Sequence, residues 1–288
     1  MSARSPTYSL DLLTVRSSLE IYDLSTNSAR VVLQTDRHIE APNWYPDGGS
    51  LLINGEGRLF RVPLDAPDLI PIDTGVADRL NNDHGISPDG QTIVISSHHE
   101  GEGSRIYWLP AAGGEPVRVT PQAPSWWHGM SPDGTTLAYV AARGSRVIDV
   151  YTKQRGKDEV RLTQGEGHCD GPDYSADGGH IYYNCDRDGH AQIWVMGADG
   201  GDQRKLFADD HVNWFPHPSP DGRHLLYLAY PPGTTGHPAD RAVALVLCDP
   251  DGGNRRRVLE FNGGQGTINV PNWAPDSSAF AFVRYEPL

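Results

Sequence analysis

Short apolar runs recur along the chain at a nearly constant spacing, with polar and turn-forming residues between them. Six of these runs have three or four residues each, at 51–53, 92–95, 137–140, 181–183, 225–228 and 280–283. Runs of this length are typical of strands, whereas helices need longer amphipathic patterns. A second run often follows, as at 105–109 and 192–196, and a third run follows a turn, as at 117–120 and 160–163.

A tetrapeptide of the Ser-Pro-Asp-Gly type precedes each of the six runs. Its copies lie at 45–48, 87–90, 131–134, 175–178, 219–222 and 274–277, so the steps between them are 42, 44, 44, 44 and 55 residues. Proline presets φ for a tight turn, aspartate caps the turn through its side chain, and glycine accepts a positive φ. We therefore interpret the six aspartates as turn-forming, and each repeat as a unit of four strands.

This repeat resembles the WD40-like PD40 repeat of the TolB family, and the resemblance covers nearly the whole chain. It implies an all-β fold with one domain, residues 1–288, built as a six-bladed β-propeller with four-stranded antiparallel blades. Too few residues follow the last motif for a complete blade. Segments 19–24 and 29–34 are therefore expected to be its outer strands and to close the ring with 270–284. Residues 7–14 form one segment more than this scheme needs.

Charge and composition exclude some classes of partner. The chain has 24 Lys and Arg against 37 Asp and Glu, and this net charge of −13 repels the phosphates of nucleic acids. The first residues contain no apolar signal segment, and no stretch approaches the ~20 apolar residues that span a bilayer. No membrane partner is expected, and we predict a cytoplasmic location. Three cysteines without a CxxC pair, Cys169, Cys185 and Cys248, favour a reduced chain.

Blade topology separates the loops onto two faces of the disc. The Pro-Asp-Gly turns join the first and second strands and mark one face. The opposite face, here called the crossing face, receives the segments that enter each blade and the loops between second and third strands. By this assignment ten of the twelve histidines lie on the crossing face, the exceptions being His180 and His224. Because the first strand is innermost, its leading residues are expected to ring the mouth of the central funnel.

The leading hypothesis is a polar small-molecule site at this mouth, with a sugar or oligosaccharide as the favoured ligand. Indole faces stack on sugar rings, while amide, carboxylate and imidazole groups bond hydroxyls. The predicted ligand-binding residues are Asn82, Trp126, Trp127, Trp214, His217, His237, Gln265 and Asn269. Catalysis would need a general base and an orienting carboxylate. The candidates for these roles are His84, His128, Asp83, Glu40 and Asp170.

Two longer loops, 230–241 and 262–267, also map to the crossing face. They are either a lid that determines specificity or simple surface excursions. An enzyme with this site would be a carbohydrate-active lyase, hydrolase or isomerase.

A divalent metal, manganese, calcium or zinc, is a narrower version of this hypothesis. The run from Phe215 to Ser219 resembles the His-Pro-His-Pro-Ser stretch of oligogalacturonate lyases, which are related propellers with a manganese-dependent, His-rich site. This resemblance makes His217 a metal-ligand candidate, and His84 and His128 complete the tentative set. Phe215 stands where those enzymes have their preceding histidine, and their longer chain holds an extra blade.

The alternative is a non-catalytic module that receives a peptide segment of a protein partner at the funnel mouth. TolB-like propellers are similar in this use of the mouth, and the acidic charge would suit a basic or aromatic segment. Other enzyme classes lack their motifs: there is no Gly-x-Ser-x-Gly elbow, no phosphate-binding P-loop and no His-Glu-x-x-His. Cys169 stands between His168 and Asp170, but adjacent residues of an extended segment point in opposite directions and form no dyad.

Overall fold

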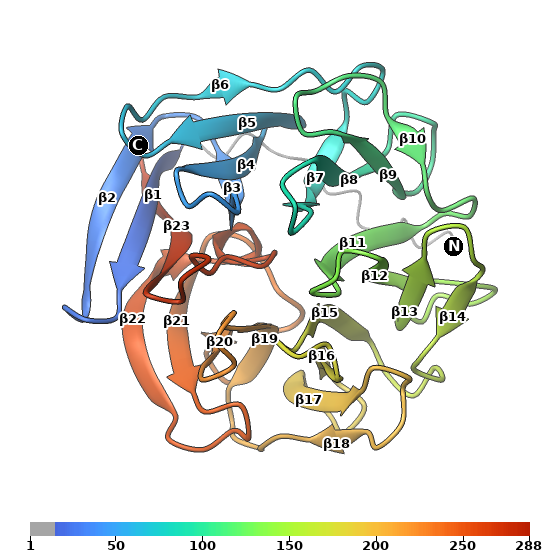
Figure 1. The fold of residues 1–288 in the computed structure, drawn as a ribbon. Coiled ribbons are helices and arrows are strands. Elements are labelled where there is room, and N and C mark those ends of the chain that lie inside the picture. Colours follow the sequence, from blue (N-terminus) through green and yellow to red (C-terminus); the bar gives the residue numbers. More distant parts are fainter. Residues whose placement is uncertain (1–14) are drawn as a thin grey trace, which may run out of the picture.

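Residues 15–288, described by a computed structural model, form six antiparallel sheets arranged around one axis (Figure 1). The first two blades contain β3 (Ile39–Trp44), β4 (Ser50–Gly55), β5 (Arg58–Pro63) and β6 (Ile70–Pro71), then β7 (Leu80–Ile86), β8 (Thr92–Ser97), β9 (Arg105–Pro110) and β10 (Val117–Arg118). The next two contain β11 (Ser125–Met130), β12 (Thr136–Ala141), β13 (Asp149–Gln154) and β14 (Glu159–Arg161), then β15 (Cys169–Tyr174), β16 (His180–Cys185), β17 (Gln192–Gly197) and β18 (Arg204–Lys205). The fifth contains β19 (Val212–Pro218), β20 (Leu225–Tyr230), β21 (Arg241–Cys248) and β22 (Arg256–Gly263). This six-bladed, all-β architecture confirms the sequence prediction.

The sixth blade is assembled from both ends of the chain. β1 (Val15–Asp23) lies between β2 (Ser28–Thr35) and β23 (Ala279–Pro287), and β1 pairs with β23 over its full length. The innermost position is filled by the segment after the 3-10 turn η1 (Gln265–Thr267), which meets β23 through the Trp273–Phe280 bridge. Ring closure therefore occurs as predicted. The predicted segment 7–14 lies outside the described residues.

The repeated motif forms the turn between the first and second strands of each blade. In the second blade Ser87 Oγ and the Gln91 amide both donate to Asp89 Oδ1, at 2.5 and 3.0 Å, and Gly90 adopts a φ of 70°. The Ser87 hydrogen bond lowers the pKa of Asp89. The same bonds recur at Asp133, Asp177 and Asp221. These aspartates are engaged in their own turns.

Apolar side chains fill the spaces between neighbouring blades. One cluster joins Val94 and Ile106 of the second blade to Leu137 and Tyr139 of the third, and another joins the first blade to the closing sixth blade. These side chains are almost fully buried, so the sheets pack face to face around the axis.

The innermost strands share an irregularity at the positions where the predicted site residues lie. Each of β3, β7, β11, β15 and β19 shifts register against its neighbour within the strand. Such bulges bend a strand and redirect its side chains. Ala41, Gly171 and Phe215 adopt positive φ values of 56°, 59° and 54° at three of these shifts. The side chains near these shifts therefore do not follow the simple alternation of a regular strand.

Candidate functional site

A continuous polar network lies at the funnel mouth, and every blade contributes to it. We name it the funnel network. Its members, from the first blade to the sixth, are Glu40, Asn82, Asp83, His128, His168, Asp170, His237 and Asn269. Apart from His168 these side chains are buried or nearly so.

Asp170 is the centre of one half of the network. Its Oδ1 lies 2.9 Å from His128 Nε2, and its Oδ2 lies 3.2 Å from His168 Nε2 and 3.8 Å from His237 Nε2. The backbone amide of Gly171 also donates to Oδ1 at 2.8 Å. Only the His168 side chain is substantially open to solvent, at 41% exposure against 10% for Asp170. One carboxylate is thus shared by three imidazoles, one of which a ligand can reach.

The charges in this half follow from these contacts. Burial alone would raise the pKa of Asp170, but His128 and His168 outweigh it and hold that pKa well below its usual value. Burial lowers the pKa of His128 and of His168, yet the Asp170 carboxylate raises both above the ordinary value. His128 Nδ1 faces the carbonyl of Asn269 at 3.4 Å, so both ring nitrogens face acceptors. Asp170 and His128 therefore each favour the charged form of the other.

His237 is the neutral member of the same half. Burial lowers its pKa to about 4, and its Nδ1 has no hydrogen-bond partner among the described residues. The side chain comes from the loop between β20 and β21, which brings it against the Trp214 ring with the centroids 4.4 Å apart. The long loop predicted as a lid or an excursion therefore supplies a buried site residue.

The other half of the network is built on Asp83. Its Oδ1 accepts a hydrogen bond from Asn269 Nδ2 at 2.6 Å, and the same amide donates to Asn82 Oδ1 at 3.2 Å. Asn82 in turn donates to Glu40 Oε1 at 3.2 Å. The pKa of Asp83 is raised to about 6, chiefly by burial. Burial also raises the pKa of Glu40. These two carboxyl groups take up protons more readily than exposed ones.

Two predicted histidines point elsewhere. His84 Nε2 lies 3.4 Å from the Leu52 carbonyl of the first blade, and burial lowers its pKa to about 4. His217 lies between Asp173 Oδ2, 3.0 Å from Nδ1, and the Ile268 carbonyl, 2.6 Å from Nε2. Within residues 15–288 no group of three or more His, Cys, Asp or Glu is arranged to hold a metal ion. The tentative metal set is therefore not assembled, because each histidine is directed to a different neighbour.

Two of the three predicted tryptophans, Trp127 and Trp214, are packed into the protein, which corrects their predicted role as stacking surfaces. Trp127 is 1% exposed and lies against Gly85 of the preceding blade, and Trp214 is 3% exposed. Trp126 packs on the apolar cluster between the third and fourth blades. The Trp127 and Trp214 rings therefore offer no face to a sugar, whereas Trp126 is only partly buried and its binding role stays a prediction. Trp214 Nε1 is buried without a partner in the described structure, so its N–H remains as a donor.

Gln265 begins η1, which lies over Glu40. A Cβ on the next residue, Gly266, would fall 2.6 Å from Glu40 Oε1 and 2.5 Å from the Tyr285 hydroxyl. Gln265 is partly buried at this edge. Gln265 therefore lies beside the first and sixth blades, and its role in binding stays a prediction.

A disulfide between Cys169 and Cys185 corrects the prediction of a fully reduced chain. The two cysteines are direct cross-strand partners in β15 and β16, which the linear spacing of 16 residues does not reveal. Cys248 is buried and free. The cysteines therefore no longer support a cytoplasmic location, which stays a prediction. No helix within the described residues is long and apolar enough to cross a membrane.

Sequence reasoning missed several groups that build the site. His168 and Asp173 were left out, although each stands beside a chosen residue. Asn184 and Ser96 were also missed: their side chains accept hydrogen bonds from the Phe215 and Trp127 amides of the next blade, at 3.0 and 2.9 Å. A polar residue stands next to the last position of the second strand in both blades, and this recurrence could have identified Ser96 and Asn184 from the sequence.

Comparison with known proteins places the chain among TolB-like propellers. The family described as PD40, TolB beta propeller domain, matches residues 121–237. An uncharacterized protein of Agrobacterium fabrum, Atu1656, is 47% identical over 277 residues, which are 96% of this chain and 94% of that protein. A solved structure from Agrobacterium tumefaciens, named as a TolB candidate, is 47% identical with a TM-score of 0.93, covering 95% of this chain and 99% of the other.

More distant structures share the fold. TolB from Acinetobacter baumannii is 18% identical with a TM-score of 0.65, over 88% of this chain and 65% of that one. An oligogalacturonate lyase in complex with manganese is 16% identical with a TM-score of 0.56, over 85% and 73% of the two chains.

Proposed function

Since this chain belongs to the TolB-like β-propeller family, we propose that it is a ligand-binding propeller whose funnel network takes a polar small molecule, with a sugar or oligosaccharide as the favoured class. The observation that carries the proposal is the Asp170 carboxylate shared by three imidazoles, one of them open to solvent. Family membership alone would not select this site, because one fold hosts many functions.

The network's mixture of donors and acceptors supports a hydroxylated ligand. Asp170 accepts hydrogen bonds, protonated imidazoles and amides donate them, and a sugar hydroxyl does both. His237 Nδ1, Asn269 Oδ1 and Trp214 Nε1 are buried without partners in the described structure. Buried polar atoms without partners are uncommon, and a bound ligand would satisfy them. Binding would therefore rest on hydrogen bonds, not on stacking against tryptophan.

No step of this proposal is routed through a metal. Carboxylate and imidazole groups, such as those of Asp170 and the three histidines, are ligands for manganese and zinc. The described side chains, however, are not arranged around a common metal position. Dialysis against a chelator is expected to leave sugar binding unchanged. A binding loss that added manganese reverses would contradict this part.

The test is calorimetric titration of the purified protein with trigalacturonate and with neutral maltotriose. The oligogalacturonate lyases of the same fold make the first probe an obvious choice. His168→Gln is expected to weaken binding about tenfold, because it removes a charge-assisted hydrogen bond. His180→Gln is the matched control, since His180 is exposed and follows a Pro-Asp-Gly-type turn, on the face opposite to the crossing face. If neither sugar binds, or if both variants bind alike, the proposal fails.

Product formation is measured in the same samples. His128 was the predicted general base, but both of its ring nitrogens face protein acceptors. His168, with Nε2 3.2 Å from Asp170 Oδ2 and a side chain that is 41% exposed, has the arrangement of a general base and its orienting carboxylate. Unsaturated or newly reducing ends would identify a lyase or a hydrolase.

A peptide-binding module is the second candidate function. The burial of the Trp127 and Trp214 rings favours it over sugar stacking, and the net charge of −13 suits a basic peptide segment. A basic peptide library passed over the immobilised protein separates the two candidates. Capture of a peptide that His168→Gln abolishes, with no sugar binding, would select the module.

A further inference from the structure

The loop between β20 and β21 carries one side chain into the funnel network. Most of its residues, from 231 to 242, are exposed, whereas the His237 side chain is only 10% exposed. The His237 ring lies against the Trp214 ring, with the centroids 4.4 Å apart, and its Nε2 lies 3.8 Å from Asp170 Oδ2. His237 therefore covers part of the Asp170 carboxylate and part of the indole ring.

Few polar contacts hold His237 in this closed position. The distance of 3.8 Å to Asp170 is too long for a hydrogen bond, and His237 Nδ1 is buried without a partner in the described residues. A buried polar atom without a partner costs free energy, which favours positions where water can reach it. The closed position therefore depends mainly on ring packing against Trp214 and Phe215, the latter with its centroid 5.4 Å away.

The first half of the loop forms no hydrogen bond to the rest of the described chain. In residues 231–236 the Thr234 amide and hydroxyl both donate to the Pro231 carbonyl, at 3.3 and 2.8 Å. The loop is anchored again at Pro238, whose carbonyl accepts a hydrogen bond from Tyr230 Oη at 3.0 Å. The arm between these two residues is therefore fixed only at its ends.

A hollow of about 590 Å³ beside this arm gives it room to move. The hollow is lined only by residues between Pro231 and Ala242, and His237 is not among them. Gly233 and Gly236 adopt φ values of 80° and 64°, and a Cβ on either would meet no atom within 4 Å. Glycines in open surroundings are suited to absorb the φ and ψ changes of a hinge. The arm can therefore move without displacing packed side chains.

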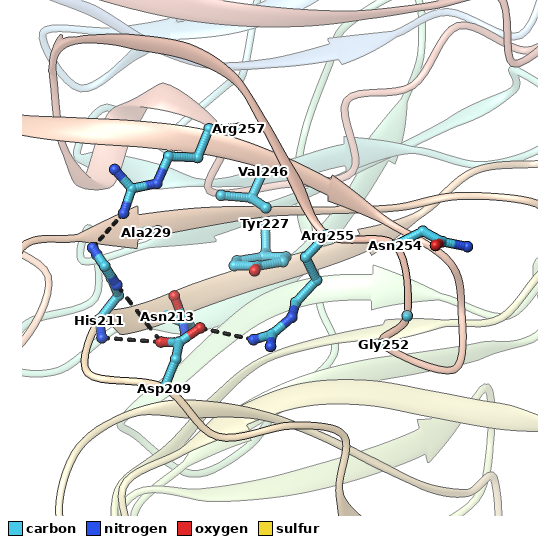
Figure 2. A pocket seen from close by; sticks show the side chains of 11 residues that line it. Asp209, His211, Asn213, Tyr227, Ala229, Val246, Gly252, Asn254, Arg255 and Arg257 are labelled. Carbon is cyan, nitrogen blue, oxygen red and sulfur yellow. Dashed lines mark hydrogen bonds and ion pairs between the residues drawn. The ribbon is translucent and has the colours of Figure 1, made fainter.

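A pocket of similar size on the fifth blade shows the opposite case (Figure 2). Its volume is about 540 Å³, and its polar side chains are bonded to one another. Arg255 Nη1 lies 2.9 Å from Asp209 Oδ2. Asp209 Oδ1 accepts hydrogen bonds from the His211 amide and from Asn213 Nδ2, at 2.9 and 3.1 Å. These bonds join the segment that enters the blade to the start of its outer strand, whereas no comparable bonds hold the arm of the loop within the described chain.

We propose that residues 231–237 are a lid, and that His237 must leave its closed position before a ligand can reach Asp170 Oδ2 and the indole N–H of Trp214. His168 is already open to solvent in the closed position, so a ligand can contact the network there first. The inference rests on the proposed function for the identity of the ligand, but opening of the lid can be measured without one.

Exchange of the Trp214 indole N–H with water measures opening of the lid in the free protein. This N–H is buried without a partner in the described structure, and so is the indole N–H of Trp127. Trp127 is 1% exposed and packs against Gly85, so it is the internal control. Nitrogen-15 labelling of the seven tryptophans gives one indole signal for each. Trp214→Phe and Trp127→Phe assign the two signals.

His237→Ala is expected to accelerate exchange at Trp214 at least about tenfold, because the covering ring is removed, and to leave exchange at Trp127 unchanged. Thr235→Ala is the matched control, since Thr235 is an exposed residue of the lid, and it should leave both rates unchanged. An unchanged Trp214 rate in His237→Ala would overturn the proposal. An equal acceleration at Trp127 would also overturn it, because it would indicate a general loosening of the fold.

Ligand entry is measured with trigalacturonate by stopped-flow fluorescence. The association rate constant is expected to be about tenfold higher for His237→Ala than for Thr235→Ala, because entry no longer waits for the lid. Equal rate constants would contradict a role of the lid in ligand entry. If trigalacturonate binds neither variant while exchange at Trp214 responds as expected, the proposed ligand is wrong and the lid is supported.

Discussion

The Trp127 ring lies against Gly85 so closely that a Cβ on Gly85 would fall 2.1 Å from ring atom Cη2. This contact joins β11 to β7 and explains why Trp127 is absent from the funnel surface. Gly85→Ala is expected to lower the free energy of unfolding by about 2 kcal/mol, through overpacking between two blades. Chemical denaturation measures it. Gly49→Ala is the control, because its nearest neighbour, Asp47 Oδ1, is 3.5 Å away; equal effects would contradict the packing explanation.

Loss of the Asp170 charge is expected to affect stability as well as binding. Asp170→Asn leaves His128 and His168 without their anion, and breaking a buried ion pair in this way costs about 3 kcal/mol. The pKa of His128 should fall as well, because Asp170 is what raises it. Denaturant unfolding and histidine NMR titration measure the two effects. Asp210→Asn, at an exposed position, serves as the control; an unchanged His128 titration would refute the assigned charges.

Asp83 is expected to make stability depend on pH. Its pKa is raised from 3.8 to about 6 in the folded protein, so its contribution is favourable below the unfolded pKa and is lost as pH rises through about 6. Asp83→Asn removes this titration. The melting temperature of the variant, relative to wild type, should therefore rise between pH 4 and pH 7, by the equivalent of roughly 2 kcal/mol. A difference that does not vary with pH would show that Asp83 has an ordinary pKa.

The disulfide is expected to stabilise the fourth blade. It closes a loop of 16 residues, and a loop of this size contributes about 3 kcal/mol by chain entropy. Cys185→Ser should lower the melting temperature, and a reductant should lower it in wild type but not in the variant. Alkylation of the unfolded protein checks the pairing directly: one thiol, that of Cys248, should react before reduction and three afterwards. Three reactive thiols before reduction would show that the bridge does not form.

The sequence was sufficient to predict the architecture because the repeat is local. Each Ser-Pro-Asp-Gly copy forms its own turn through bonds such as Ser87 to Asp89, and such bonds need no distant partner. Ring closure was also predictable. The segment around the last motif accounts for only two strands of the sixth blade, and β1 and β2 provide the missing two.

The site was predicted only in part, because its geometry is set by bulges and by contacts between blades. Most residues of the funnel network were named from the sequence, but strand position could not show that Trp127 turns towards Gly85 or that His84 turns towards Leu52. The partnership of Cys169 and Cys185 likewise depends on strand register. His237 was assigned to the right face, but only the structure shows its loop reaching Asp170.

The pairing of β1 with β23 has a consequence for biosynthesis. About 250 residues separate the two strands, and a ribosome adds roughly 5–20 residues per second, so β1 must wait on the order of 10–50 s for its partner. During this time the edge of β1 that β23 will cover has unpaired backbone groups that another nascent chain could bind. The ring cannot close before the last strand leaves the ribosome, so ribosomes stalled ahead of β23 would release an open, association-prone chain.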